Sequence, residues 1–249
     1  MKIFGILICV FLLSAICMAE ETEYFDWKGS KLYASKDYAG ALPYFEQALS
    51  QDPSYIDAWI HKGNTMKALK EYNESLASYN AALKVDSNNV AAWVGIRDAY
   101  TAMKDYANAS IAAAKATELD DKNKAYWLLE GNLLQLQGMY KEAGEKYDGA
   151  LALDPKYKDA LYKKGVVLMV QGSYADAAKL LDQVTEIDPS YKQAYIAKGV
   201  AHEANGKYVE AQQAYDKALE IDSTYSHALT NKMHVLLALK KPDEAMKIF

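Results

Sequence analysis

The apolar and polar positions of this chain recur every 34 residues from Thr22 to Phe249, without insertion or deletion. Six full repeats cover residues 22–55, 56–89, 90–123, 124–157, 158–191 and 192–225, and a partial seventh covers 226–249. A strict period of this length is typical of a repeat array, in which each unit buries its apolar face against its neighbours. We number positions 1–34 within each repeat.

The spacing inside each repeat predicts two amphipathic helices. Large or small apolar residues recur at positions 4, 8 and 11, and again at 20, 24 and 27, which are helical intervals. Gly138, Gly172 and Gly206 fill position 15, where a helix that ends in a left-handed residue favours glycine. Position 31 carries an Asp that precedes proline in three repeats and should end the second helix; these residues are Asp52, Asp154 and Asp188.

The residue types in these positions resemble the tetratricopeptide repeat. Position 20 is Ala in every repeat except at Ser75, and position 8 is most often Gly. Position 4 carries large residues: Phe25, Trp59, Trp93, Trp127, Leu161, Tyr195 and Leu229. Position 24 is mostly aromatic: Phe45, Tyr79, Ala113, Tyr147, Leu181, Tyr215 and Phe249. The resemblance implies an all-α, right-handed α-solenoid of helix-turn-helix repeats over residues 20–249.

The same resemblance implies a concave groove lined by positions 2, 5, 9 and 12 of the first helices. Its N-terminal half would present a polar ladder, and its C-terminal half an apolar pocket for partner side chains. The candidate groove residues are Asn64, Asp98, Asn132, Leu128, Tyr162, Val166, Met169, Ile196 and Val200. Some family members hold a terminal carboxylate with Lys at position 5, but Ile60 and Leu128 occupy that position here.

These features predict a non-enzymatic scaffold that binds a peptide or partner helix in its groove. The alternative is an assembly subunit of an envelope complex, which would dock or self-associate through an uncapped C-terminal repeat. Under that alternative, apolar residues of the seventh repeat would be partly uncovered: Leu229, Val235, Leu236 and Leu239.

The third repeat departs from the pattern. Arg97 replaces the glycine of position 8, and Ala113 replaces the aromatic residue of position 24. The departure indicates either a hinge in the solenoid or drift that neighbouring repeats tolerate.

Residues 1–19 differ from the repeats. Lys2 precedes an uncharged apolar stretch from Ile3 to Ala19, which predicts a cleaved signal peptide or an N-terminal membrane anchor. We therefore expect a secreted, periplasmic or cell-envelope protein. Cys9 and Cys17 are the only cysteines, so the repeats contain no disulfide or thiolate metal site. Asn73 and Asn108 match the glycosylation pattern, and the sequence leaves their use open.

Charge and motifs exclude several functions. The formal net charge is −5 and no basic run occurs, which argues against nucleic-acid binding. His202-Glu203 lacks the second histidine that a zinc-protease helix needs. His227 and His234 share a helix face but supply too few ligands for a metal. We expect no catalytic residue, cofactor or metal.

Overall fold

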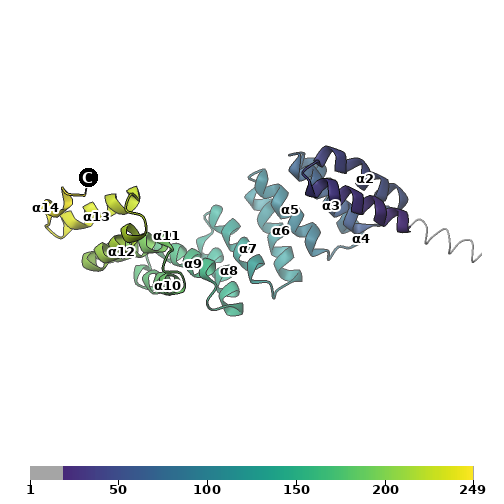
Figure 1. The fold of residues 1–249 in the computed structure, drawn as a ribbon. Helices are drawn as coiled ribbons and strands as arrows, with labels where there is room; N and C mark the ends of the chain where they lie inside the picture. The colour runs from purple at the N-terminus through teal and green to yellow at the C-terminus, as the bar shows by residue number, and fades with distance from the viewer. Residues whose placement is uncertain (1–18, 249) are drawn as a thin grey trace, which may run out of the picture. The chain divides into compact units, whose positions relative to one another are not determined.

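The computed structural model describes residues 19–248, and these residues form helices joined by short turns (Figure 1). Residues 19–34 are helical and are followed by thirteen labelled helices within the described part of the chain. Their bounds are α2 (Tyr38–Gln51), α3 (Ile56–Ala68), α4 (Tyr72–Val85), α5 (Val90–Ala102), α6 (Tyr106–Leu119), α7 (Lys124–Leu136), α8 (Tyr140–Leu153), α9 (Lys158–Val170), α10 (Tyr174–Ile187), α11 (Lys192–Ala204), α12 (Tyr208–Ile221), α13 (Ser226–Ala238) and α14 (Pro242–Ala245).

Each repeat supplies one antiparallel helix pair, so the predicted all-α helix-turn-helix architecture is confirmed. The chain divides into two compact units after Asp120, at the end of the third repeat. The N-terminal unit holds residues 19–34 and α2–α6, and the C-terminal unit holds α7–α14.

The aromatic residue of position 24 forms the centre of most repeats. Tyr79, Tyr147 and Tyr215 have no exposed surface. Each ring lies against the glycine of position 8 in the same repeat, and a Cβ atom on Gly63 would sit 2.5 Å from the Tyr79 ring. Glycine is therefore required wherever position 24 is tyrosine, because a methyl group would overlap the ring.

The turn between the two helices has the same backbone conformation in all seven repeats. The predicted left-handed residues Gly138, Gly172 and Gly206 have φ of 77°, 79° and 74°. Lysine adopts this conformation at the other position-15 residues, which are Lys36, Lys70, Lys104 and Lys240. A left-handed lysine costs roughly 1–2 kcal/mol that glycine avoids, so the two solutions differ in stability.

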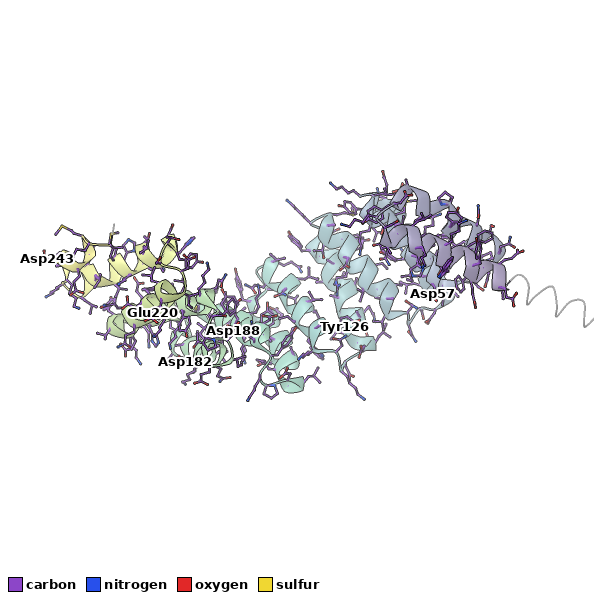
Figure 2. All side chains as sticks on the ribbon, viewed as in Figure 1. Asp57, Tyr126, Asp182, Asp188, Glu220 and Asp243 are labelled. Carbon is purple, nitrogen blue, oxygen red and sulfur yellow. The ribbon has the colours of Figure 1, made fainter. Side chains whose placement is uncertain are left out.

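Aspartate at position 31 ends the second helix with or without a following proline. Asp188, labelled in Figure 2, follows α10 with a non-helical ψ of 89° and accepts a hydrogen bond from the Ser190 N–H at 3.1 Å. Asp86 and Asp222 make the equivalent bond to the residue two positions on, although no proline follows them. The aspartate side chain, which holds the turn, is therefore the common element.

The expectation that Val235 and Leu236 are uncovered is wrong. Val235 is 0% exposed and Leu236 is 1% exposed. Val235 packs with Ala211 and Tyr215 of α12, because α12 lies against α13. Leu229 and Leu239 are half-buried.

Residues 1–18, which contain most of the expected signal or anchor segment, lie outside the described residues. Among residues 19–248, no helix combines the length and apolar character that crossing a bilayer requires.

Candidate functional site

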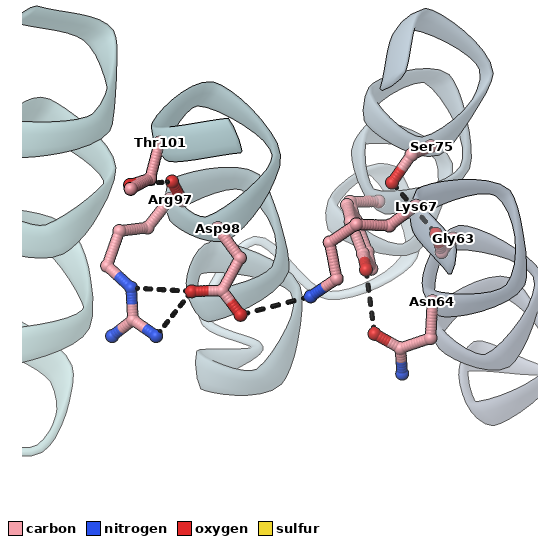
Figure 3. Close-up of polar contacts among 8 residues, drawn as sticks. Gly63, Asn64, Lys67, Ser75, Arg97, Asp98 and Thr101 are labelled. Atoms are coloured by element: carbon pink, nitrogen blue, oxygen red, sulfur yellow. Dashed lines mark hydrogen bonds and ion pairs between the residues drawn. The ribbon is translucent and has the colours of Figure 1, made fainter. Parts of the chain in front are cut away.

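A charged network lies on the first helices of the N-terminal unit (Figure 3). Arg97 Nε and Nη2 donate to Asp98 Oδ1 at 3.0 Å and 2.7 Å, and Lys67 Nζ donates to Asp98 Oδ2 at 3.0 Å. Burial alone would raise the pKa of Asp98, but the charge and hydrogen bonds of Arg97 and Lys67 hold it below its usual value. Asp98 is therefore ionised, and both of its oxygens are occupied within the protein.

Arg97 also accounts for the irregular third repeat. Arg97 is 9% exposed and Ala113 is 2% exposed, so both lie in the core. In the second, fourth and sixth repeats, a position-24 tyrosine ring lies against glycine at position 8. The third repeat reverses this order of side-chain sizes. Its large residue, Arg97, is at position 8, and its small residue, Ala113, is at position 24. This exchange conserves volume, which cores tolerate best.

The two predicted groove asparagines bind buried tyrosines. Tyr79 Oη donates to Asn64 Oδ1 at 2.7 Å, as Figure 3 shows for Asn64. Tyr147 Oη lies 3.0 Å from Asn132 Oδ1 and 2.8 Å from Gln135 Oε1. Burial raises the pKa of both tyrosines, which keeps their hydroxyl protons in place. Because the carbonyl oxygens face the tyrosines, the side-chain NH₂ groups of Asn64 and Asn132 remain as donors.

A cavity of about 350 Å³ opens on the C-terminal unit beside Asn132. Its lining residues are Asn132, Gln135, Leu136, Tyr140, Lys163 and Val170. Leu136 and Val170 are 60% and 56% exposed, although both are large apolar side chains. Lys163 forms no ion pair with any residue between 19 and 248. The cavity thus combines amide donors, one unpaired cation and two exposed apolar side chains.

Of the nine predicted groove residues, Asn132 alone lines this cavity. Leu128 is 8% exposed and packs with Tyr147 in the core. The remaining apolar candidates are half-buried. Tyr162, Met169, Ile196 and Val200 pack against core clusters of the C-terminal unit, and Val166 is half-buried as well.

The sequence contained a signal for the missed residues Leu136 and Val170. Both occupy position 13, which is Ala in the other five repeats. A position that is small everywhere except in two adjacent repeats indicates a local role beyond the common core.

A serine and an aspartate of the helix of residues 19–34 lie beside a histidine of α3, but their geometry does not suit nucleophilic catalysis. His61 Nδ1 lies 2.7 Å from Asp26 Oδ1 and 3.4 Å from Ser30 Oγ. A catalytic triad uses the two imidazole nitrogens separately, one for each partner. The hydrogen bond to Asp26 raises the pKa of His61 despite opposing burial. Residues 19–248 contain no cluster of three or more His, Cys, Asp or Glu suited to a metal.

Comparisons with known proteins identify the repeat. Two family models described as tetratricopeptide repeat match, one at residues 128–192 and 162–226 and the other at 32–77. The solved structure of YrrB, described as a tetratricopeptide repeat protein with an unusual peptide-binding site, is 25% identical with a TM-score of 0.68. That match covers 76% of this chain and 97% of YrrB.

Two more distant structures share the fold alone. A tetratricopeptide repeat protein from Parabacteroides merdae ATCC 43184 is 16% identical, has a TM-score of 0.68, and covers 92% of this chain and 91% of its own. MamA from Desulfovibrio magneticus RS-1 is 20% identical, has a TM-score of 0.62, and covers 64% and 90%. No curated protein matches the sequence.

Proposed function

The chain belongs to the tetratricopeptide repeat family, whose members generally serve as non-enzymatic scaffolds for protein interactions, and we propose that it binds an extended peptide in the groove of its C-terminal unit. The observation that carries this proposal is the cavity beside Asn132, with Leu136 and Val170 exposed at its rim. An exposed apolar pair beside polar groups is the usual composition of a ligand site.

The hydrogen-bonding state of the groove indicates which groups a ligand supplies. The single proton of the Tyr147 hydroxyl is shared between the oxygens of Asn132 and Gln135, which both face it, so the NH₂ groups of these two side chains are the donors left for a ligand. Backbone carbonyls of an extended peptide would accept these bonds, with little dependence on sequence. An apolar side chain of the peptide would lie between Leu136 and Val170, and Lys163 would favour a nearby carboxylate.

The N-terminal unit, taken by itself, carries groups that suit the same mode of binding. Asn64 keeps its side-chain NH₂ group as a donor. The negative charge of Asp98 is balanced by the positive charges of Arg97 and Lys67. The net positive charge of this three-residue network also favours acceptors on the ligand. The description of YrrB supports peptide binding as the general mode.

The test selects random twelve-residue peptides displayed on phage against the full-length chain. Affinities of the enriched peptides are then measured for the wild type and for the double variant Leu136→Ala/Val170→Ala. Both substitutions restore the alanine of the other repeats, so folding should be unaffected. We expect binding to weaken about tenfold or more, because rim side chains that contact a ligand dominate affinity.

The matched control is Leu153→Ala/Ile187→Ala, which removes two side chains of 44% and 41% exposure that do not line the cavity. Enriched peptides that bind the cavity variant and the control variant equally would overturn the groove proposal.

A second candidate function is that of an assembly subunit that docks through the seventh repeat. Its docking surface would include Leu237 and Met246 in place of the buried Val235 and Leu236. Leu237 is 52% exposed and Met246 is 75% exposed. Sedimentation of the wild type and of Leu237→Ser/Met246→Ser tests it. Association that disappears in the variant supports this candidate, and equal behaviour removes it.

We also propose that the protein acts outside the cytoplasm. The support is the apolar segment 3–19 and the lack of cysteine after Cys17. N-terminal sequencing of the protein from its native host should find Glu20 as the first residue if the segment is a cleaved signal. A retained Met1 in a soluble fraction would contradict export.

A further inference from the structure

Within each unit, the first helix of every repeat after the first has one face that the preceding second helix covers. Positions 3 and 10 lie on this face, and position 3 is a fully buried alanine in five repeats: Ala58, Ala92, Ala160, Ala194 and Ala228. Ala58 packs with Ala48 and Leu49 of α2, and Ala194 packs with Val184 of α10. Small residues here allow close helix packing.

The same face carries a recurring ion pair. Lysine at position 7 binds an acid at position 25 of the covering helix: Lys62 with Glu46 at 2.9 Å, Lys198 with Asp182 at 2.5 Å, Lys232 with Asp216 at 2.6 Å, and Lys164 with Asp148. In these four repeats, the face therefore binds the same kind of partner, which is an amphipathic helix with one carboxylate directed at the lysine.

The helix of residues 19–34 presents this face without a covering helix in the described part of the chain. Lys28 occupies position 7 but forms no ion pair with any described residue; its Nζ lies 4.6 Å from the Tyr44 ring centre. Tyr24 and Trp27 are 51% and 55% exposed, and Lys31 Nζ lies 5.0 Å from the Trp27 ring centre. Tyr24 takes the place of the buried alanine of other repeats.

We propose that this face, formed by Tyr24, Trp27, Lys28 and Lys31, binds an amphipathic helix of a partner protein that directs a carboxylate at Lys28. Exposed tyrosine and tryptophan are the side chains that contribute most to protein interfaces. In the covered repeats, the residue of the covering helix that packs against position 3 is alanine or valine, Ala48 against Ala58 and Val184 against Ala194, and Tyr24 would contact the partner helix at this level. Residues 3–18 contain no acidic side chain and cannot supply the carboxylate.

The probe is a fluorescent peptide of residues 173–190, which contains α10 and Asp182, held helical by a hydrocarbon staple. In the chain, this helix covers the corresponding face of α11 through Lys198. We expect the peptide to bind the full-length chain, and Trp27→Ala to weaken binding about tenfold. Lys28→Gln and the peptide substitution Asp182→Asn should each weaken it about threefold, and together no further, because they remove the same ion pair.

Leu69→Ala, at an exposed leucine outside this face, is the matched control and should bind as the wild type does. Absence of binding, or binding that Trp27→Ala leaves unchanged, would overturn the proposal. Phosphatidylcholine vesicles form a second arm. Attachment to vesicles that depends on Trp27, without peptide binding, would assign the face to a lipid surface and reject the helix partner.

Discussion

The N-terminal and C-terminal units follow one 34-residue period, but the turns that lead from one repeat to the next are held by different chemistry. In the C-terminal unit, the lysine at position 1 binds the position-31 aspartate and lies over the position-34 tyrosine. Lys158 Nζ lies 2.7 Å from Asp188 Oδ2 and 5.0 Å from the Tyr191 ring centre. The same arrangement joins Lys124 to Asp154 and Lys192 to Asp222.

The N-terminal unit has no such lysine at the start of α3 or α5, where Ile56 and Val90 stand. Instead, Asn89 caps α5 by accepting from the Ala92 N–H at 2.9 Å. Its left-handed turn residues are lysines, whereas three of the four in the C-terminal unit are glycines. The comparison teaches that the period fixes the helices, while the links between them can differ from one repeat to the next.

The largest expected effect concerns the aromatic core that the third repeat lacks. Tyr147→Ala should lower the free energy of unfolding by about 3–5 kcal/mol, because it empties a fully buried site against Gly131. The measurement is urea unfolding followed by circular dichroism. A loss below about 1 kcal/mol would show that alanine at position 24 is tolerated without the compensating arginine of the third repeat.

The second effect tests that compensation directly. Ala113→Tyr alone should destabilise by about 1–3 kcal/mol, because a buried arginine stands at position 8, where the tyrosine rings of other repeats lie against glycine. Adding Arg97→Gly should recover most of the loss and make the third repeat resemble its neighbours. Unfolding of both single variants and the double variant gives the coupling energy. Additive losses would contradict a size exchange between the two positions.

The turn residues give a smaller effect that has opposite signs in the two units. Gly172→Lys should destabilise by about 1 kcal/mol, since φ is +79° and lysine disfavours this conformation. Lys70→Gly should stabilise by no more than about 1 kcal/mol, because glycine loses more chain entropy on folding. Thermal unfolding of both variants measures the difference. Equal shifts of the same sign would contradict the conformational explanation.

The sequence predicted both helices of each repeat and the left-handed glycines, because these depend on local spacing and backbone preference. It did not predict that Asn64 and Asn132 turn their oxygens toward buried tyrosines, since that depends on where a ring from the second helix ends. It did contain unused signals. Position 3 is Ala in five repeats but Tyr24 and Tyr126 in the first repeat of each unit.

Acid should weaken the lysine–aspartate links of the C-terminal unit. Hydrogen bonds from Lys158 and Ser190 lower the pKa of Asp188 to about 2. The native state therefore gains stability from this carboxylate above pH 4, and the gain is lost as the pH falls toward 2. Amide hydrogen exchange between pH 5 and 2.5 should show α9–α11 losing protection, and Lys158→Met should reduce that dependence. Unchanged dependence in Lys158→Met would contradict a role for the ion pair.

The smallest effect sharpens the comparison from the N-terminal unit, where a histidine joins neighbouring repeats. Bonding to Asp26 raises the pKa of His61 above its ordinary value of about 6.5. The stabilisation is thus fully present below pH 6.5 and is lost as the pH rises through the higher native value. The side chain of His61 is 38% exposed, so solvent screens the pair and the change should be modest. Thermal unfolding between pH 5.5 and 8.5 should show a decline that His61→Gln abolishes, whereas Lys158→Met should leave it intact. A decline that persists in His61→Gln would assign the pH dependence to another group, and the contact between His61 and Asp26 would then not be the link that titrates near neutral pH.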